Sequence, residues 1–198
     1  MHPISGLGSK YRMFILKTAL ATLAAIATLT AANAQAQTQD GPIVTGNSSG
    51  ETADALKTRE AIAYARPLPR GAPSADYPLV AWCDALVTGH ADLGDTLPTK
   101  APEDVELVRL GRLEAQDFRS ALAVAAPRQS AASKAEADQA VAGVKAQWAT
   151  LMSNPDAEAR SQSFGLFFGL PGRCEHAARR IRNNVTTPPA TLESVGIN

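Results

Sequence analysis

The sequence lacks an excess of charge of either sign, and beyond its first 36 residues it lacks any long apolar run. Its 198 residues hold 19 lysines and arginines against 19 aspartates and glutamates, so the formal net charge is zero. General nucleic-acid binders are usually basic, and a membrane-spanning helix needs about 20 predominantly apolar residues. The composition therefore argues against nucleic-acid binding, and we expect no membrane span outside the N-terminal segment.

Patterns that would indicate a cofactor site or a β-sheet are also missing. The chain contains no glycine-rich phosphate loop, no His-Glu-x-x-His motif and no calcium-binding loop. Almost no stretch alternates apolar and polar residues, the pattern of a half-buried strand. We therefore expect no substantial sheet, no bound metal and no cofactor.

The N-terminal segment has the layout of a secretory signal peptide. A basic residue, Lys17, precedes a small-residue apolar run over 18–29, and two small-x-small patterns follow within 32–36. We predict a signal peptide over 1–36, in which 1–12 stems from an upstream start codon; the alternative is an uncleaved anchor. Cleavage would leave 16 basic and 19 acidic residues, a net charge of −3. The expected location is periplasmic or secreted.

Only two cysteines remain after the predicted cleavage, Cys83 and Cys174. An even pair in an exported protein indicates a disulfide, and both cysteines lie on apolar helical stripes. We therefore predict a Cys83–Cys174 bond. The alternatives are two buried thiols, or a zinc site completed by His90 and Glu114, since structural zinc takes four ligands.

Apolar residues recur at helical spacing through most of the remaining chain. Short loops between long amphipathic helices favour an all-α, up-and-down bundle of four to five helices, closed by one disulfide. We expect a flexible leader over 37–52, a helical domain over 53–186 and a flexible tail over 187–198. The spacing and the helix-breaking residues predict helices over 54–65, 77–93, 103–125, 130–153, 157–170 and 173–184.

His90 and Glu114 are the candidate catalytic residues. His90 falls on the apolar stripe of the helix predicted over 77–93, and Glu114 falls on a stripe with Leu107, Leu110 and Phe118. A carboxylate is costly to bury unpaired, so we expect Glu114 to meet His90 or an arginine, or to lie at the edge of the bundle. The pair is either structural or an acid/base pair.

The stretch Gly172 to Arg182, "GRCEHAARRIR", places Cys174 two residues before His176. On a helix these side chains point about 200° apart, so they cannot chelate one metal. The haem motif C-x-x-C-H of the c′-type cytochromes also fails here, because its first cysteine is missing and its histidine is displaced.

The same stretch predicts a cationic helix face. With Cys174 facing inward, the side chains expected outside are Arg173, His176 and Arg180, flanked by Arg179 and Arg182. One interpretation is a solvated face that complements the helix dipole. The other is a strip that docks to an anionic envelope component or an acidic protein, with contacts that weaken as salt rises.

These features predict an exported, non-enzymatic binding or interaction protein of the bacterial cell envelope. The alternative is a small periplasmic enzyme or ligand-handling protein that uses a His90/Glu114 pair in the bundle.

Overall fold

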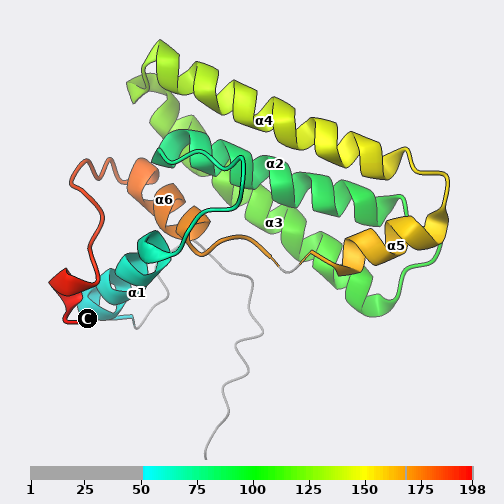
Figure 1. Cartoon of the computed structure of the whole chain (residues 1–198), viewed down its shortest axis with the longest axis horizontal. Helices are drawn as coiled ribbons and strands as arrows, with labels where there is room; N and C mark the ends of the chain where they lie inside the picture. Colours follow the sequence, from blue (N-terminus) through cyan, green and yellow to red (C-terminus); the bar gives the residue numbers. More distant parts are fainter. Residues whose placement is uncertain (1–50, 168, 198) are drawn as a thin grey trace, which may run out of the picture. The chain divides into compact units, whose positions relative to one another are not determined.

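A computed structural model describes residues 51–167 and 169–197 of the chain. In these ranges the structure contains α-helices and two short 3-10 helices but no strand, so the predicted all-α bundle is confirmed (Figure 1). The predicted signal peptide and residues 37–50 of the predicted leader lie outside the described residues. The elements are α1 (Ala53–Ala65), α2 (Asp76–Asp95), α3 (Pro102–Ala125), η1 (Ala126–Arg128), α4 (Ala131–Met152), α5 (Ala157–Gly165), α6 (Arg173–Arg182) and η2 (Glu193–Val195).

The three longest helices form the body of the bundle. Along the chain, each of α2, α3 and α4 runs antiparallel to the helix before it. In space, α2 lies between α3 and α4 (Figure 1). At one end α6 packs on both α2 and α3, and α1 packs on α6. At the other end α5 packs on α2 and α4. α6 therefore has the bundle on one side and α1 on the other.

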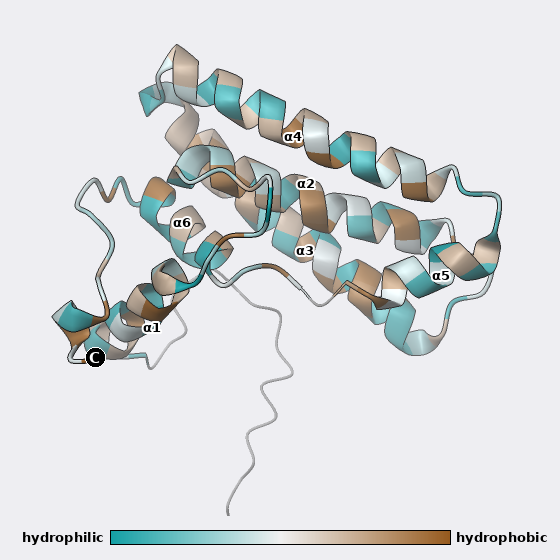
Figure 2. Ribbon diagram, in the orientation of Figure 1, coloured by the Kyte–Doolittle hydropathy of each residue, from teal (hydrophilic) through white to brown (hydrophobic). Residues whose placement is uncertain are grey.

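The core is built from large apolar residues of α2 and small residues of α3. Leu79, Cys83 and Leu93 are fully buried on α2, as its stripe predicts. α3 presents one large side chain, Phe118, among buried small residues, and apolar and polar residues are mixed along its length in Figure 2. The small residues facing α2 and its neighbours are Gly111, Ala115, Ala121 and Ala125.

The predicted inner stripe of α3 is partly wrong. Phe118 is buried, but Leu107 is 49% exposed and Leu110 is only half-buried. The small residues of α3 let its backbone approach α2 closely: a Cβ on Gly111 would stand in ordinary contact with Val87. Close packing thus selects the face of α3 with the smallest side chains, and the leucines lie beside it.

Helix ends follow the local sequence. The Ser130 hydroxyl accepts a hydrogen bond from the Ser133 amide and begins α4, and the Asp156 carboxylate accepts from two amides and begins α5. α5 ends at Gly165, earlier than predicted. The residues that follow include Gly169 in the left-handed region, at φ 93°, and Pro171, which together prevent a continuous helix.

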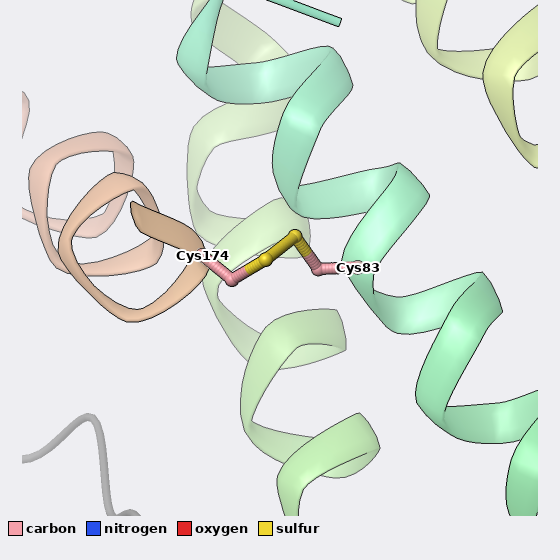
Figure 3. The surroundings of a disulfide bond; sticks show 2 residues. All are labelled: Cys83 and Cys174. Carbon is pink, nitrogen blue, oxygen red and sulfur yellow. A yellow bond between two sulfur atoms is a disulfide. The ribbon is translucent and has the colours of Figure 1, made fainter. Parts of the chain in front are cut away.

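The disulfide joins the bundle to the last helix. Cys83 of α2 and Cys174 of α6 are bonded, and both are almost fully buried (Figure 3). The predicted pairing is confirmed. The zinc alternative is wrong, because both sulfur atoms are used in the bond.

The contact between α2 and α4 predicts a strong effect at Gly89. A Cβ on Gly89 would stand 2.0 Å from Trp148 Cδ1, because the indole lies directly on this glycine. We expect Gly89→Ala to lower the free energy of unfolding by about 1–3 kcal/mol, the usual cost of overpacking. Urea denaturation followed by circular dichroism measures the change.

Gly143 provides the matched control. It lies within α4, and a Cβ there would meet nothing within 4 Å. Gly143→Ala should therefore stabilise the protein by up to about 1 kcal/mol through helix propensity. Equal effects of the two substitutions would contradict the described packing of Trp148 on α2.

Candidate functional site

A cleft of about 420 Å³ lies between α1, the loop that follows it and the beginning of α6. The end of α1, the loop after it and the segment that leads into α6 all contribute lining residues. Its lining combines arginines with aliphatic residues and prolines. The lining residues are Arg59, Ile62, Ala63, Arg66, Pro67, Leu68, Pro69, Leu170, Pro171, Gly172, Arg173, Glu175 and His176.

His176 is the most unusual residue of this cleft. It is only 3% exposed, and its Nδ1 is buried without a hydrogen-bond partner. Within the described part of the chain, its Nε2 has no hydrogen-bond partner either. Burial is the main cause that lowers the pKa of His176 to about 4, and the positive charges of Arg59 and Arg179 lower it further. The ring is therefore neutral at pH 7.

The predicted outward position of His176 is wrong. α6 buries the side of Cys174 against α2 and α3, and α1 covers much of the opposite side. A single-helix projection shows that the two residues face apart, but it does not show that a second layer lies over the outer face.

The three arginines of the cleft are engaged to different degrees. Arg59 pairs with Glu51 at 2.6 Å and with Glu175 at 3.4 Å. Arg173 lies over the Tyr64 ring, 4.3 Å from its centroid, and its Nε is buried without a hydrogen-bond partner among the described residues. Arg66 is exposed and forms no hydrogen bond or ion pair with any described residue. Arg66 is thus the guanidinium most available to a ligand.

The N-terminus of α6 opens onto the same cleft. The helix has ten residues, its N-cap is Gly172, and no side chain caps its first turn. The first amides of a helix lack partners within it, and the helix dipole adds partial positive charge at that end. Gly172 and Arg173 line the cleft, so the uncapped end adds further positive potential beside the arginines.

The second correction concerns Arg180, which is buried rather than exposed. Its side chain is 5% exposed, and it donates to Glu60 and to Asp76 at 2.9 Å each. Arg179 also pairs with Glu60. Since Glu60 belongs to α1 and Asp76 to α2, these arginines join α6 to both helices.

Arg182 completes the predicted strip. It pairs with Asp117 of α3 at 2.5 Å. The arginines of the last turn of α6 therefore make contacts within the fold, whereas Arg173 and His176 line the cleft.

His90 is a core histidine. It is 6% exposed, its Nε2 donates to the carbonyl oxygen of Phe164 at 3.0 Å, and its ring stacks on Phe164 and Phe167. Burial lowers its pKa. All these contacts come from α5 and the residues just after it.

Glu114 lies in different surroundings, at the edge of the bundle. It is half-buried, and burial is the main cause that raises its pKa to about 7. The negative charges of Glu175 and Asp117 raise the pKa further. No hydrogen bond or ion pair between described residues joins Glu114 to His90, so the structure does not bring the candidate catalytic pair together.

Glu114 gives the fold a specific pH dependence. Its pKa is about 7 in the folded protein against 4.5 ordinarily, so the folded state favours the protonated acid. The penalty for its charge is complete above pH 7 and absent below pH 4.5. We expect Glu114→Gln to raise the free energy of unfolding at pH 8 by about 2–3 kcal/mol, with little change at pH 4. Urea denaturation at the two pH values tests this.

Glu106→Gln is the control, because Glu106 is an exposed residue of the same helix in a surface pair with Arg109. Glu106→Gln should leave the free energy of unfolding at pH 8 nearly unchanged, because its ion pair is fully exposed. His176 has the opposite pH dependence, since its lowered pKa removes stability as pH falls from 6.5 to 4. That contribution is common to all three proteins and cancels in the comparison. A destabilising effect of Glu114→Gln at pH 8 would contradict the prediction.

Comparison with protein-family models, with curated proteins and with solved structures finds no match for this chain. Among the described residues, no helix combines the length and apolar character needed to cross a membrane. The same residues hold no group of three or more His, Cys, Asp or Glu side chains placed to bind a metal ion.

Proposed function

We propose that this protein is an exported, non-enzymatic binding protein of the bacterial cell envelope that holds a small anion in the cleft between α1 and α6. The observation that carries the proposal is His176, a deeply buried side chain on the cleft whose Nδ1 is buried without a hydrogen-bond partner among the described residues. Nearly all buried polar groups in proteins are hydrogen-bonded, and leaving one unsatisfied costs about 1–3 kcal/mol. A ligand in the cleft would offer the ring a hydrogen-bond partner that the described residues do not supply.

The charges of the cleft favour an anion. Arg66 lies on the cleft without an ion-pair partner in the described chain, and the uncapped end of α6 lies beside it. Helix N-termini and guanidinium groups are the usual partners of carboxylates and phosphates in proteins. His176 is neutral at pH 7, so it offers one donor and one acceptor without adding charge.

Two further observations support the location. The sequence over 13–36 has the order of regions of a secretory signal peptide. The Cys83–Cys174 bond is typical of proteins in an oxidising compartment such as the periplasm or the extracellular space. Both agree with a binding protein that meets its ligand outside the cytoplasm.

The proposal is tested by calorimetric titration of the oxidised, mature protein with acetate, octanoate and inorganic phosphate. At least one of these anions should bind, and Arg66→Gln should weaken its binding about tenfold, since a hydrogen bond to a charged group contributes about 1.5–3 kcal/mol. Raising the salt concentration should weaken binding as well.

Arg70→Gln is the matched control for this experiment. Arg70 lies four residues beyond Arg66, is also exposed and is not part of the cleft lining. The Arg70→Gln variant should bind the anions with the same affinity as the parent protein. The absence of binding of all three anions, or equal weakening by the two substitutions, would contradict the proposed function.

A further inference from the structure

We infer that the ligand of this cleft is a monocarboxylate with an extended apolar body, of the chemical type of a medium-chain fatty acid. This inference rests on the proposed function and names the ligand class of the same site. It is drawn from the net charge of the lining, from the chemistry of the walls and from the size of the cleft.

The net charge of the lining matches one negative charge. Three arginines and Glu175 line the cleft, which leaves two positive charges. Arg59 also pairs with Glu51, which is outside the lining, and this acid reduces the net charge around the cleft to +1. A carboxylate carries one negative charge at pH 7, whereas a phosphate monoester carries about −1.5 to −2. The carboxylate is therefore the better match.

The walls suit an apolar body. Ile62 of α1, Leu68 of the loop that follows it and Leu170 of the segment before α6 all line the cleft. Three of the remaining lining residues are prolines, which have no backbone N–H to donate. A polyhydroxylated ligand such as a sugar would find few donors on these walls, whereas an alkyl chain needs none.

The polar groups of the lining come from the beginning of α6 and from the end of α1. The neutral ring of His176 supplies one N–H donor, and Arg66 supplies the charge. The first turn of α6 has no side-chain cap and adds amides other than that of Cys174, which donates to the Pro171 carbonyl oxygen. These groups would hold the carboxylate, and the aliphatic side chains would contact the body. The volume of about 420 Å³ lies near the lower end of the range for small-molecule sites, which limits the chain to medium length.

The experiment measures dissociation constants of the oxidised, mature protein for acetate, butanoate, hexanoate and octanoate. Each added methylene should tighten binding about fourfold while the cleft fills, the factor that corresponds to burial of one CH₂ group. Octanamide, which has the same body without the charge, should bind at least tenfold more weakly than octanoate. Octyl phosphate should also bind more weakly than octanoate.

A pair of variants locates the apolar contact. Ile62→Ser should weaken octanoate binding severalfold and leave acetate binding unchanged, since Ile62 is exposed on the cleft wall. Val105→Ser is the control, because Val105 is an exposed residue of α3 that is not part of the lining. Both residues are exposed, so neither substitution opens a cavity in the core.

The outcomes separate the two proposals. Acetate or phosphate binding that depends on Arg66, without any gain along the carboxylate series, would overturn the ligand class and leave the proposed function intact. Equal affinity for octanamide and octanoate would overturn the carboxylate. Failure of every anion to bind would overturn the proposed function itself.

Discussion

Replacement of both cysteines by alanine, Cys83→Ala with Cys174→Ala, is expected to lower the free energy of unfolding by about 3–5 kcal/mol. The bond joins residues 91 positions apart, and in the chain-entropy model a cross-link that closes a loop of this length stabilises by about 4–5 kcal/mol, with smaller effects common in practice. Urea denaturation of the oxidised protein and of the double variant measures the difference. Domains of this size have total stabilities of about 5–15 kcal/mol, so the loss would be a large share.

A chemical control distinguishes the cross-link from the side chains. Reduction of the parent protein should lower its stability by a similar amount, whereas the same reductant should leave the double variant unchanged. Two additional measurements therefore isolate the bond. A double variant as stable as the oxidised parent would show that packing of α6 against α2 and α3 holds this end of the bundle without the cross-link.

The second large effect is expected at Arg180. Its side chain is almost fully buried between Glu60 and Asp76, and Glu60 is itself only 7% exposed. Arg180→Met should lower the free energy of unfolding by about 3–5 kcal/mol, because it removes the arginine that pairs with the buried Glu60 and the half-buried Asp76. Arg179, which also pairs with Glu60, places the effect toward the lower end of that range.

A second variant tests the physical reason. Arg180→Met combined with Glu60→Leu should recover part of the loss, since the buried carboxylate of α1 is then removed together with its arginine. Asp76 and Arg179 still lose a partner, so the recovery is incomplete. Arg109→Met is the surface control, because the pair of Arg109 with Glu106 is exposed on both sides. This substitution should leave the free energy of unfolding nearly unchanged. A loss no larger than that of Arg109→Met would contradict the role of Arg180 as the buried link between α1, α2 and α6.

The sequence predicts much of this fold because the buried face of α2 is marked by large apolar side chains at helical spacing. Leu79, Cys83 and Leu93 recur at helical spacing, and they are buried as that spacing predicts. The disulfide follows because only two cysteines remain after the predicted cleavage. α3 is predicted less well, because its buried face consists mainly of alanine and glycine. These residues are less hydrophobic than exposed leucines such as Leu107, so the hydrophobic pattern points to the wrong face.

The cleft could not be predicted from the sequence, for a different physical reason. Arg59 and Arg66 belong to α1 and its following loop, more than 100 residues before His176, and no pattern in α1 indicates which of its sides meets α6. The projection of α6 correctly places Cys174, Ala177 and Ile181 inside. Whether its other side meets solvent or a second layer depends on tertiary packing alone, and this is why the positions of His176 and Arg180 were predicted wrongly.

The thin apolar contact of α1 has a consequence for hydrogen exchange. Its buried residues are only Glu60, Ala61 and Ala63, whereas α2 buries most of its length. Regions with few buried apolar contacts open at a lower free energy than the global transition, so the amides of α1 should exchange well before those of α2. The cleft exists only while α1 is docked on α6. A bound ligand would therefore slow exchange in α1 while it leaves the slowest amides of α2 unchanged, and that contrast reports occupancy of the cleft without any label on the ligand.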